Sequence, residues 1–105
     1  MNSTVTNHYK NKRYKRENFI NKYIHGDGKV VDTFIIDRGH KNGLERHEIT
    51  ENGIILIYNN TSNALISKLI ARPNQIQRYY KKEGREPPPR VMYLSQWHKD
   101  LGYNK

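Results

Sequence analysis

One histidine and one tyrosine stand where a β-hairpin could bring them together. The step Asn52-Gly53 separates two runs of β-branched residues and favours a two-residue hairpin turn. The register of that turn places His47 opposite Tyr58, with their β carbons about 5 Å apart. A histidine with an ordinary pKa near 6.5 can accept or donate a proton at neutral pH. The hairpin therefore predicts a proton-transfer pair on one sheet face.

Three further basic side chains are expected near this pair. A three-residue second turn would place Lys68 on the face of His47, whereas a one-residue slip would move it to the other face. Arg72 ends the last strand, and His40 lies in a glycine-containing loop. Cations of this kind can neutralise a phosphate that gains charge. The candidate catalytic residues are His40, His47, Tyr58, Lys68 and Arg72. The alternatives are a packed His47–Tyr58 pair, a surface His40 and an Arg72 that caps the sheet edge.

Two segments interleave cations with tyrosines, one over residues 9–16 and the other over residues 72–85. Single-stranded bases can stack on tyrosine rings while cations hold the phosphates. The predicted nucleic-acid contacts are Lys12, Arg13, Lys15, Arg16, Arg78, Tyr79, Tyr80, Lys81 and Lys82. The alternatives are a solvated N-terminal arm and, for the second segment, a helix with one buried tyrosine.

The net charge supports an acidic partner. The chain has 19 Lys and Arg against 10 Asp and Glu, for +9, and the excess is concentrated in residues 1–24 and 72–90. Nucleic acid or an acidic protein surface would meet this charge. The absence of cysteine excludes disulfides, a thiol nucleophile and cysteine-bound zinc. The five histidines lack metal-ligand spacing, so neither a metal nor another cofactor is expected.

The pattern of apolar and turn residues predicts one α+β domain. The expected elements are a helix over 9–24, strands over 29–37, 46–50, 54–58 and 64–70, and helices over 74–82 and 91–101. Residues 1–8 should be a disordered tail, and residues 83–90 a proline-rich linker. The strands should form an antiparallel meander with helices packed on it. Both faces of the middle strands are apolar, so both need a cover, which a partner such as a second copy could supply in part.

No apolar run reaches the ~18 residues of a membrane span, and the polar N-terminus lacks the apolar core of a signal peptide. We therefore expect a protein of the bacterial cytoplasm that has no membrane partner.

The segment RGHKNGLERHEITENGIILIYNNTSNALISKLIARPNQIQRYY, residues 38–80, resembles the barnase–EndoU–colicin–RelE group of small ribonucleases in its layout and residue types. Members of that group place a helix before a four-stranded antiparallel sheet. The chain is also similar to small proteins of phages and mobile elements in low-GC Gram-positive bacteria.

The resemblance to the ribonucleases implies metal-independent RNA cleavage that leaves a cyclic phosphate. It implies that His47 acts as acid or base and that Lys68 and Arg72 hold the phosphate. Tyr58 or Thr50 would supply an assisting hydroxyl.

Three functions are compatible with these observations. The favoured one is nucleic-acid binding without catalysis, with phosphates contacted through residues 9–16 and 72–85. The alternatives are a toxin-like, metal-independent endoribonuclease that uses His47, and a phage protein that inhibits a host protein by binding an acidic surface of that host protein. Cleavage of RNA in the presence of EDTA, salt-dependent binding alone, or neither would separate the three.

Overall fold

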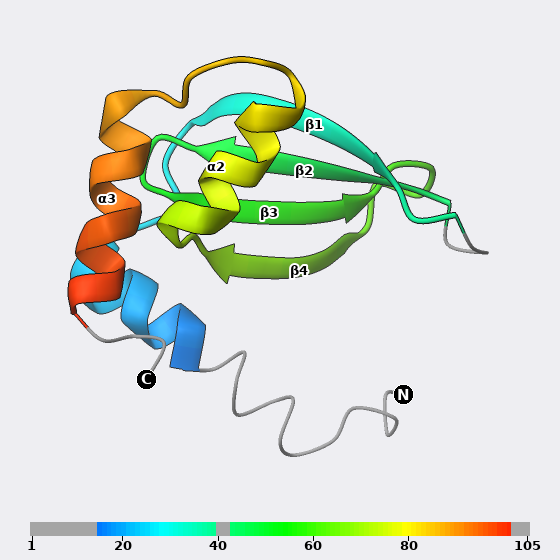
Figure 1. Ribbon diagram of the computed structural model, residues 1–105. Helices are drawn as coiled ribbons and strands as arrows, with labels where there is room; N and C mark the ends of the chain where they lie inside the picture. Colours follow the sequence, from blue (N-terminus) through cyan, green and yellow to red (C-terminus); the bar gives the residue numbers. More distant parts are fainter. Residues whose placement is uncertain (1–14, 40–42, 102–105) are drawn as a thin grey trace, which may run out of the picture.

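Four consecutive strands form an antiparallel meander in the order β1-β2-β3-β4 (Figure 1). The strands are β1 (Val30–Asp37), β2 (Leu44–Thr50), β3 (Ile54–Asn59) and β4 (Leu65–Ile70). The computed structural model describes residues 15–39 and 43–101 of the 105-residue chain. A helix precedes the sheet and two helices follow it, which confirms the predicted α+β layout.

The helix before the sheet ends in a wider, π-helical turn. Residues 15–19 are α-helical and lead into η1 (Ile20–Ile24). His25 adopts φ 64° and its N–H donates to the carbonyl of Ile20 at 2.6 Å, and Gly26 follows at φ 110°. These left-handed residues end the helix close to the predicted glycine break. Residues 1–14, where the sequence predicts a tail and the start of a helix, lie outside the described residues.

The two helices after the sheet are α2 (Pro73–Lys82) and α3 (Pro89–Asp100). Both begin with a proline, whose fixed φ and missing N–H suit the first helical turn. The predicted linker is therefore shorter by two residues than expected and covers residues 83–88. α2 lies across one face of the sheet, and α3 lies beside it at one end of the strands (Figure 1).

Each face of the sheet has its own apolar core. On one face, Ile76 and Tyr80 of α2 pack with strand residues such as Ile49 and Ile55. On the other face, Ile20 of η1 packs with a second group, Ile54, Leu56 and Ile70. The chain therefore covers both apolar faces of the middle strands with its own helices.

The β2–β3 turn differs from the predicted one by one residue. The carbonyl of Thr50 accepts from the N–H of Gly53 at 3.0 Å, and Gly53 takes φ 78°, as in a three-residue loop that closes on a left-handed glycine. Glu51 is drawn to the start of β1, where its N–H donates to the carbonyl of Lys29 at 2.8 Å. The hydroxyl of Thr50 accepts from the N–H of Ile54 at 3.1 Å. These bonds stabilise the longer loop.

The observed register gives His47 and Tyr58 different cross-strand neighbours from those predicted. His47 lies opposite Ile57, and Arg46 lies opposite Tyr58 with its guanidinium 4.6 Å from the ring centroid. The predicted pairing of His47 with Tyr58 is wrong, because a slip of one residue exchanges the faces of a strand. Lys68 pairs with Leu56 and so shares the face of Tyr58, away from His47.

Candidate functional site

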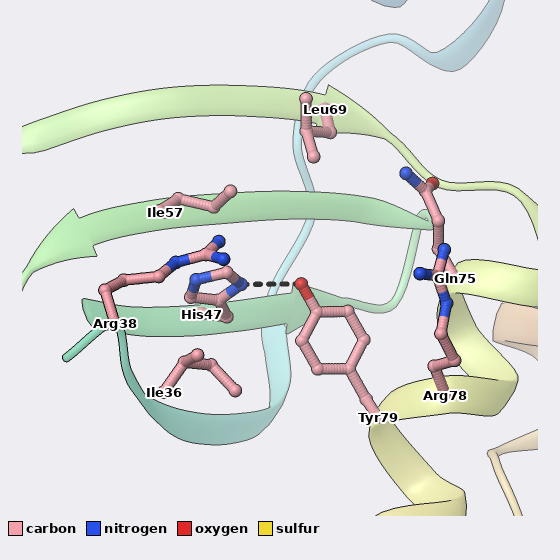
Figure 2. A pocket seen from close by; sticks show the side chains of 8 residues that line it. All are labelled: Ile36, Arg38, His47, Ile57, Leu69, Gln75, Arg78 and Tyr79. Atoms are coloured by element: carbon pink, nitrogen blue, oxygen red, sulfur yellow. Dashed lines mark hydrogen bonds between the residues drawn. The ribbon is translucent and has the colours of Figure 1, made fainter. Parts of the chain in front are cut away.

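A pocket of about 250 Å³ lies between α2 and the sheet (Figure 2). All four strands and α2 contribute side chains to it, together with Arg38, which follows β1. Figure 2 shows Tyr79 reaching from α2 toward His47 on β2, with Arg38 beside His47 and Arg78 beside Tyr79. The residues that line it are Ile36, Arg38, His47, Ile57, Leu69, Gln75, Arg78 and Tyr79.

A chain of hydrogen bonds runs through the floor of this pocket. Nε2 of His47 lies 2.9 Å from Oε1 of Glu45, and Nδ1 lies 2.6 Å from the hydroxyl of Tyr79. A carboxylate can only accept, so Nε2–H donates to Glu45. In the neutral ring Nδ1 then accepts from the O–H of Tyr79. Glu45 also accepts from Nε of Arg38 at 2.8 Å.

The backbone explains why these groups meet. Glu45 and His47 are two residues apart on β2, so their side chains share one face. Arg38 follows β1 directly, and its N–H donates to the carbonyl of Gly43 at 3.2 Å, which holds the two strand ends together. Tyr79 lies three residues after the buried Ile76, on the side of α2 that turns toward the sheet.

Burial and the neighbouring groups determine the charges of the three hydrogen-bonded side chains, Glu45, His47 and Tyr79. Burial lowers the pKa of His47, an effect that Arg38 and Lys82 reinforce and Glu45 opposes. The hydrogen bond from His47 lowers the pKa of Glu45, although burial acts against it. Burial raises the pKa of Tyr79. At neutral pH the hydrogen-bonded series therefore consists of an ionised Glu45, a neutral His47 imidazole and a protonated Tyr79 phenol.

Positive charge surrounds the mouth of the pocket. The side chain of Arg38 is 47% exposed although it pairs with Glu45. Arg78 is exposed and has no hydrogen bond or ion pair with the rest of the described chain. Lys82, also exposed, is close enough to act on the pKa of His47. Guanidinium groups bind phosphate oxygens through strong, charge-assisted hydrogen bonds, so the pocket can hold an anion.

The predicted catalytic set is not assembled in one place. Only His47 lines the pocket; Tyr58 belongs to the core on the other face. Lys68 lies on that other face too, where its Nζ pairs with Glu17 at 2.8 Å and Asp27 at 3.2 Å.

The other two members of that set are not placed in the pocket. Arg72 is exposed just before α2 and is not among the residues that line the pocket. His40 lies outside the described residues.

The predicted contacts of α2 divide into surface and core. Arg78, Lys81 and Lys82 are exposed, and Tyr79 lines the pocket. Tyr80 is wholly buried, its hydroxyl donates to Asp32, and it packs in the core. Its ring is not available to stack on a base, so the prediction that Tyr80 contacts nucleic acid is corrected. The helix has one buried tyrosine, as the alternative interpretation predicted.

The N-terminal contacts are described only from residue 15. Lys15 is exposed, whereas Nη1 of Arg16 donates to the carbonyl of Lys68 at 2.8 Å. Arg16 thus has a structural partner on β4. Lys12 and Arg13 lie outside the described residues.

Sequence reasoning missed three members of the site: Arg38, Glu45 and Gln75. The spacing of Glu45 and His47 on one strand was a usable signal, because a carboxylate two residues from a histidine shares its face. No comparable local signal marks Arg38 or Gln75, which reach the pocket only once β1 and α2 have docked on β2.

Residues 15–39 and 43–101 contain no cluster of three or more His, Asp or Glu that could hold a metal ion. Among the described helices, none combines the length and the apolar character needed to cross a membrane. Comparison with known protein families, curated proteins and solved structures finds no match.

Proposed function

We propose that the protein binds nucleic acid and seats a backbone phosphate in the pocket between α2 and the sheet. The observation that carries this proposal is the pair of guanidinium groups in the pocket lining, Arg38 just after β1 and Arg78 on α2 beside Tyr79. Arg78 has no anionic partner within the described ranges, so binding a phosphate breaks no existing contact of its side chain.

The exposed surface of α2 continues this basic site. Lys81 and Lys82 are exposed in its last turn, and Arg72 is exposed just before its first turn. A row of cations along one helix can follow successive phosphates of a strand. Segments 72–85 and 9–16 would both contribute, since both carry an excess of positive charge.

The salt dependence of binding tests this proposal. Each phosphate contact that is removed should lower the slope of log K against log salt by about one. We expect that loss for both Arg38→Gln and Arg78→Gln, measured by fluorescence anisotropy with labelled single-stranded RNA, single-stranded DNA and duplex DNA. Gln retains a donor toward Glu45 in the first variant.

Lys29→Gln is the matched control. It removes one exposed positive charge just before β1, whereas Arg38 follows the other end of the same strand, nine residues and roughly 30 Å along the chain. The control should keep the wild-type slope more closely than the two arginine variants. Equal slopes in all four proteins would contradict the proposed phosphate seat.

A second candidate function, metal-independent RNA cleavage, is favoured by the Glu45–His47–Tyr79 chain. His47 is only 3% exposed, so a substrate proton would reach it through the hydroxyl of Tyr79. The 2′ oxygen of RNA would lose its proton to this relay and bond to phosphorus. The 5′ oxygen would leave with a proton from water, and the products would be a cyclic phosphate and a 5′ hydroxyl. Arg38 and Arg78 would stabilise the charge on the phosphate oxygens.

A denaturing gel in the presence of EDTA tests this second candidate. RNA should be cut and DNA, which lacks the 2′ hydroxyl, should stay intact. Tyr79→Phe should lower the cleavage rate by about 10²-fold or more, with binding retained. Intact RNA at stoichiometric protein would leave binding alone, and undiminished cleavage by Tyr79→Phe would contradict the relay.

A further inference from the structure

A second pocket, of about 170 Å³, lies between η1, the β2–β3 turn and α3. In Figure 1 the N-terminal helix and α3 lie next to each other at one end of the sheet. The side chains relevant to its chemistry are Tyr23, Asn52, Arg90, Tyr93, Trp97 and His98. This pocket shares no lining residue with the pocket around His47.

His98 is a buried polar group without a partner. Its side chain is wholly buried, and neither ring nitrogen has a hydrogen-bond partner in the described part of the chain. Burial lowers the pKa of His98, and the backbone of Ala71 opposes this effect only in part. Buried polar groups normally find partners, so an unpaired imidazole in a pocket wall indicates a place for a ligand.

The ring of His98 is also held in place. A Cβ on Gly53 would stand 3.0 Å from Cε1 of His98, so the glycine of the hairpin turn leaves room for the imidazole. The ring of Phe19 meets it edge to face at 6.2 Å between centroids. The imidazole therefore keeps one orientation in the wall of the pocket with a donor and an acceptor unused.

Aromatic rings form the more open sides of the pocket. Tyr93 and Trp97 are four residues apart on α3 and so share a face. Tyr93 is 69% exposed and Tyr23, on η1, is 41% exposed, so both rings are accessible to a ligand. Flat π faces of this kind stack on planar heteroaromatic ligands.

A cation stands at the edge of the same pocket. Arg90 is exposed, and it donates through Nε to the carbonyl of Glu51 at 3.1 Å and through Nη2 to the side chain of Asn52 at 3.2 Å. These two bonds orient the guanidinium and leave its other N–H groups available. They can bind an anionic group attached to whatever ligand enters the pocket.

We propose that this pocket binds one unstacked nucleobase, which stacks on the aromatic rings beside His98 and places its phosphate on Arg90. Sites for whole drug-sized ligands span roughly 300–1,000 Å³, so a pocket of this size suits a single ring system. The proposal extends the proposed function from phosphate binding to base binding. The base can belong to a single strand or to a free nucleotide.

Trp97 is the only tryptophan of the chain and lies in the pocket wall, so its fluorescence reports occupancy. We would titrate the full chain with a single-stranded oligonucleotide, with an abasic strand of equal length, and with free nucleoside monophosphates. The base-bearing strand should quench Trp97 and bind about tenfold more tightly than the abasic strand, which keeps the phosphates. Equal affinity and equal quenching by the two strands would overturn the proposal.

The variant Tyr93→Ala separates stacking from charge. Its side chain is mostly exposed, so the fold should persist; the affinity for the base-bearing strand should fall about tenfold, and that for the abasic strand should not change. Gln96→Ala, an exposed position on the same helix, is the control and should bind both strands as the wild type does. Unchanged binding of the base-bearing strand by Tyr93→Ala would contradict the base pocket.

The same titrations distinguish failure of this inference from failure of the proposed function. If both strands bind with a steep salt dependence and no ligand quenches Trp97, phosphate binding stands and the base pocket is overturned. If neither strand binds but a free nucleoside monophosphate quenches Trp97, and Tyr93→Ala abolishes that effect, the base pocket is supported and the proposed function fails.

Discussion

Tyr79 of α2 and His47 of β2 are joined by a hydrogen bond of 2.6 Å between residues 32 positions apart in the chain. This polar contact lies beside the apolar core formed by the same two elements. It positions the phenol at a pocket with Arg38 and Arg78 in its lining. One bond therefore serves both the docking of α2 and the chemistry of the candidate site.

Removal of the Tyr79 hydroxyl should destabilise the fold. In Tyr79→Phe, Nδ1 of His47 loses its partner while staying buried, and a buried unpaired polar group costs about 1–3 kcal/mol. Urea denaturation measures this change in the free energy of unfolding. Tyr93→Phe is the matched control, since that side chain is 69% exposed and should change stability by less than about 0.5 kcal/mol. Equal stabilities of the two variants would contradict the proposed importance of the bond.

Acidification should destabilise the protein below about pH 6.5. Burial lowers the pKa of both His47 and His98 below the ordinary value of 6.5, so the unfolded chain binds more protons than the folded chain as the pH falls through this value. The lowered pKa of Glu45 adds stability that is present above its ordinary pKa and is lost as the pH falls further. Urea midpoints between pH 8 and pH 5 measure the loss.

Variants should assign this pH dependence. His47→Gln should make the decrease in stability below pH 6.5 shallower, because one of the two buried rings no longer takes up a proton on unfolding. His25→Asn, at an exposed position whose left-handed φ asparagine tolerates, should retain the decrease. Stability that rises on acidification from pH 7 to pH 5 would show that the buried histidines do not dominate.

Loss of the Lys68 charge should leave nucleic-acid binding unchanged. Burial alone would lower the pKa of Lys68, but its bonds to Glu17 and Asp27 outweigh this and raise it. The charge is thus already compensated, on the face opposite the pocket. Lys68→Met should keep the affinity and the salt slope of the wild type and lose at most about 1 kcal/mol of stability. A loss of affinity as large as that of Arg78→Gln would favour a binding surface on the other face.

Two glycines with similar backbone angles should respond differently to alanine. Gly53 and Gly84 adopt φ of 78° and 64°, so a side chain is strained at either position, by roughly 1–2 kcal/mol. At Gly84 an added Cβ meets no atom within 4 Å, whereas at Gly53 it would stand 3.0 Å from the His98 ring. Gly53→Ala should therefore cost more in urea denaturation than Gly84→Ala, and equal costs would show that His98 yields easily.

The order of the elements followed from local signals in the sequence. β-branched runs favour strands, as at residues 30–36, and helical spacing with glycine and proline breaks indicated where the helices end. Such preferences act over a few residues, so they are legible without the rest of the fold. The predicted α+β layout is confirmed for this reason.

The register of the central hairpin depended on contacts outside it. Asn52-Gly53 alone favours a two-residue turn, but the bond from Glu51 to Lys29, just before β1, belongs to the longer loop that forms. One residue of slip moved Tyr58 and Lys68 away from His47. The conformational preference of a two-residue turn is weaker than the stabilisation from hydrogen bonds to the neighbouring strand segment.

By itself, the sequence determined the order of the helices and strands and the basic character of α2, because these depend on composition and short-range periodicity. Only the tertiary structure decided that Tyr79 meets His47 while Tyr80 enters the core, and that Arg38 and Glu45 complete the site. It alone also placed His98 in a second pocket. Such contacts join residues far apart in the chain, and their formation depends on how whole faces of strands and helices pack, which no short stretch of sequence specifies.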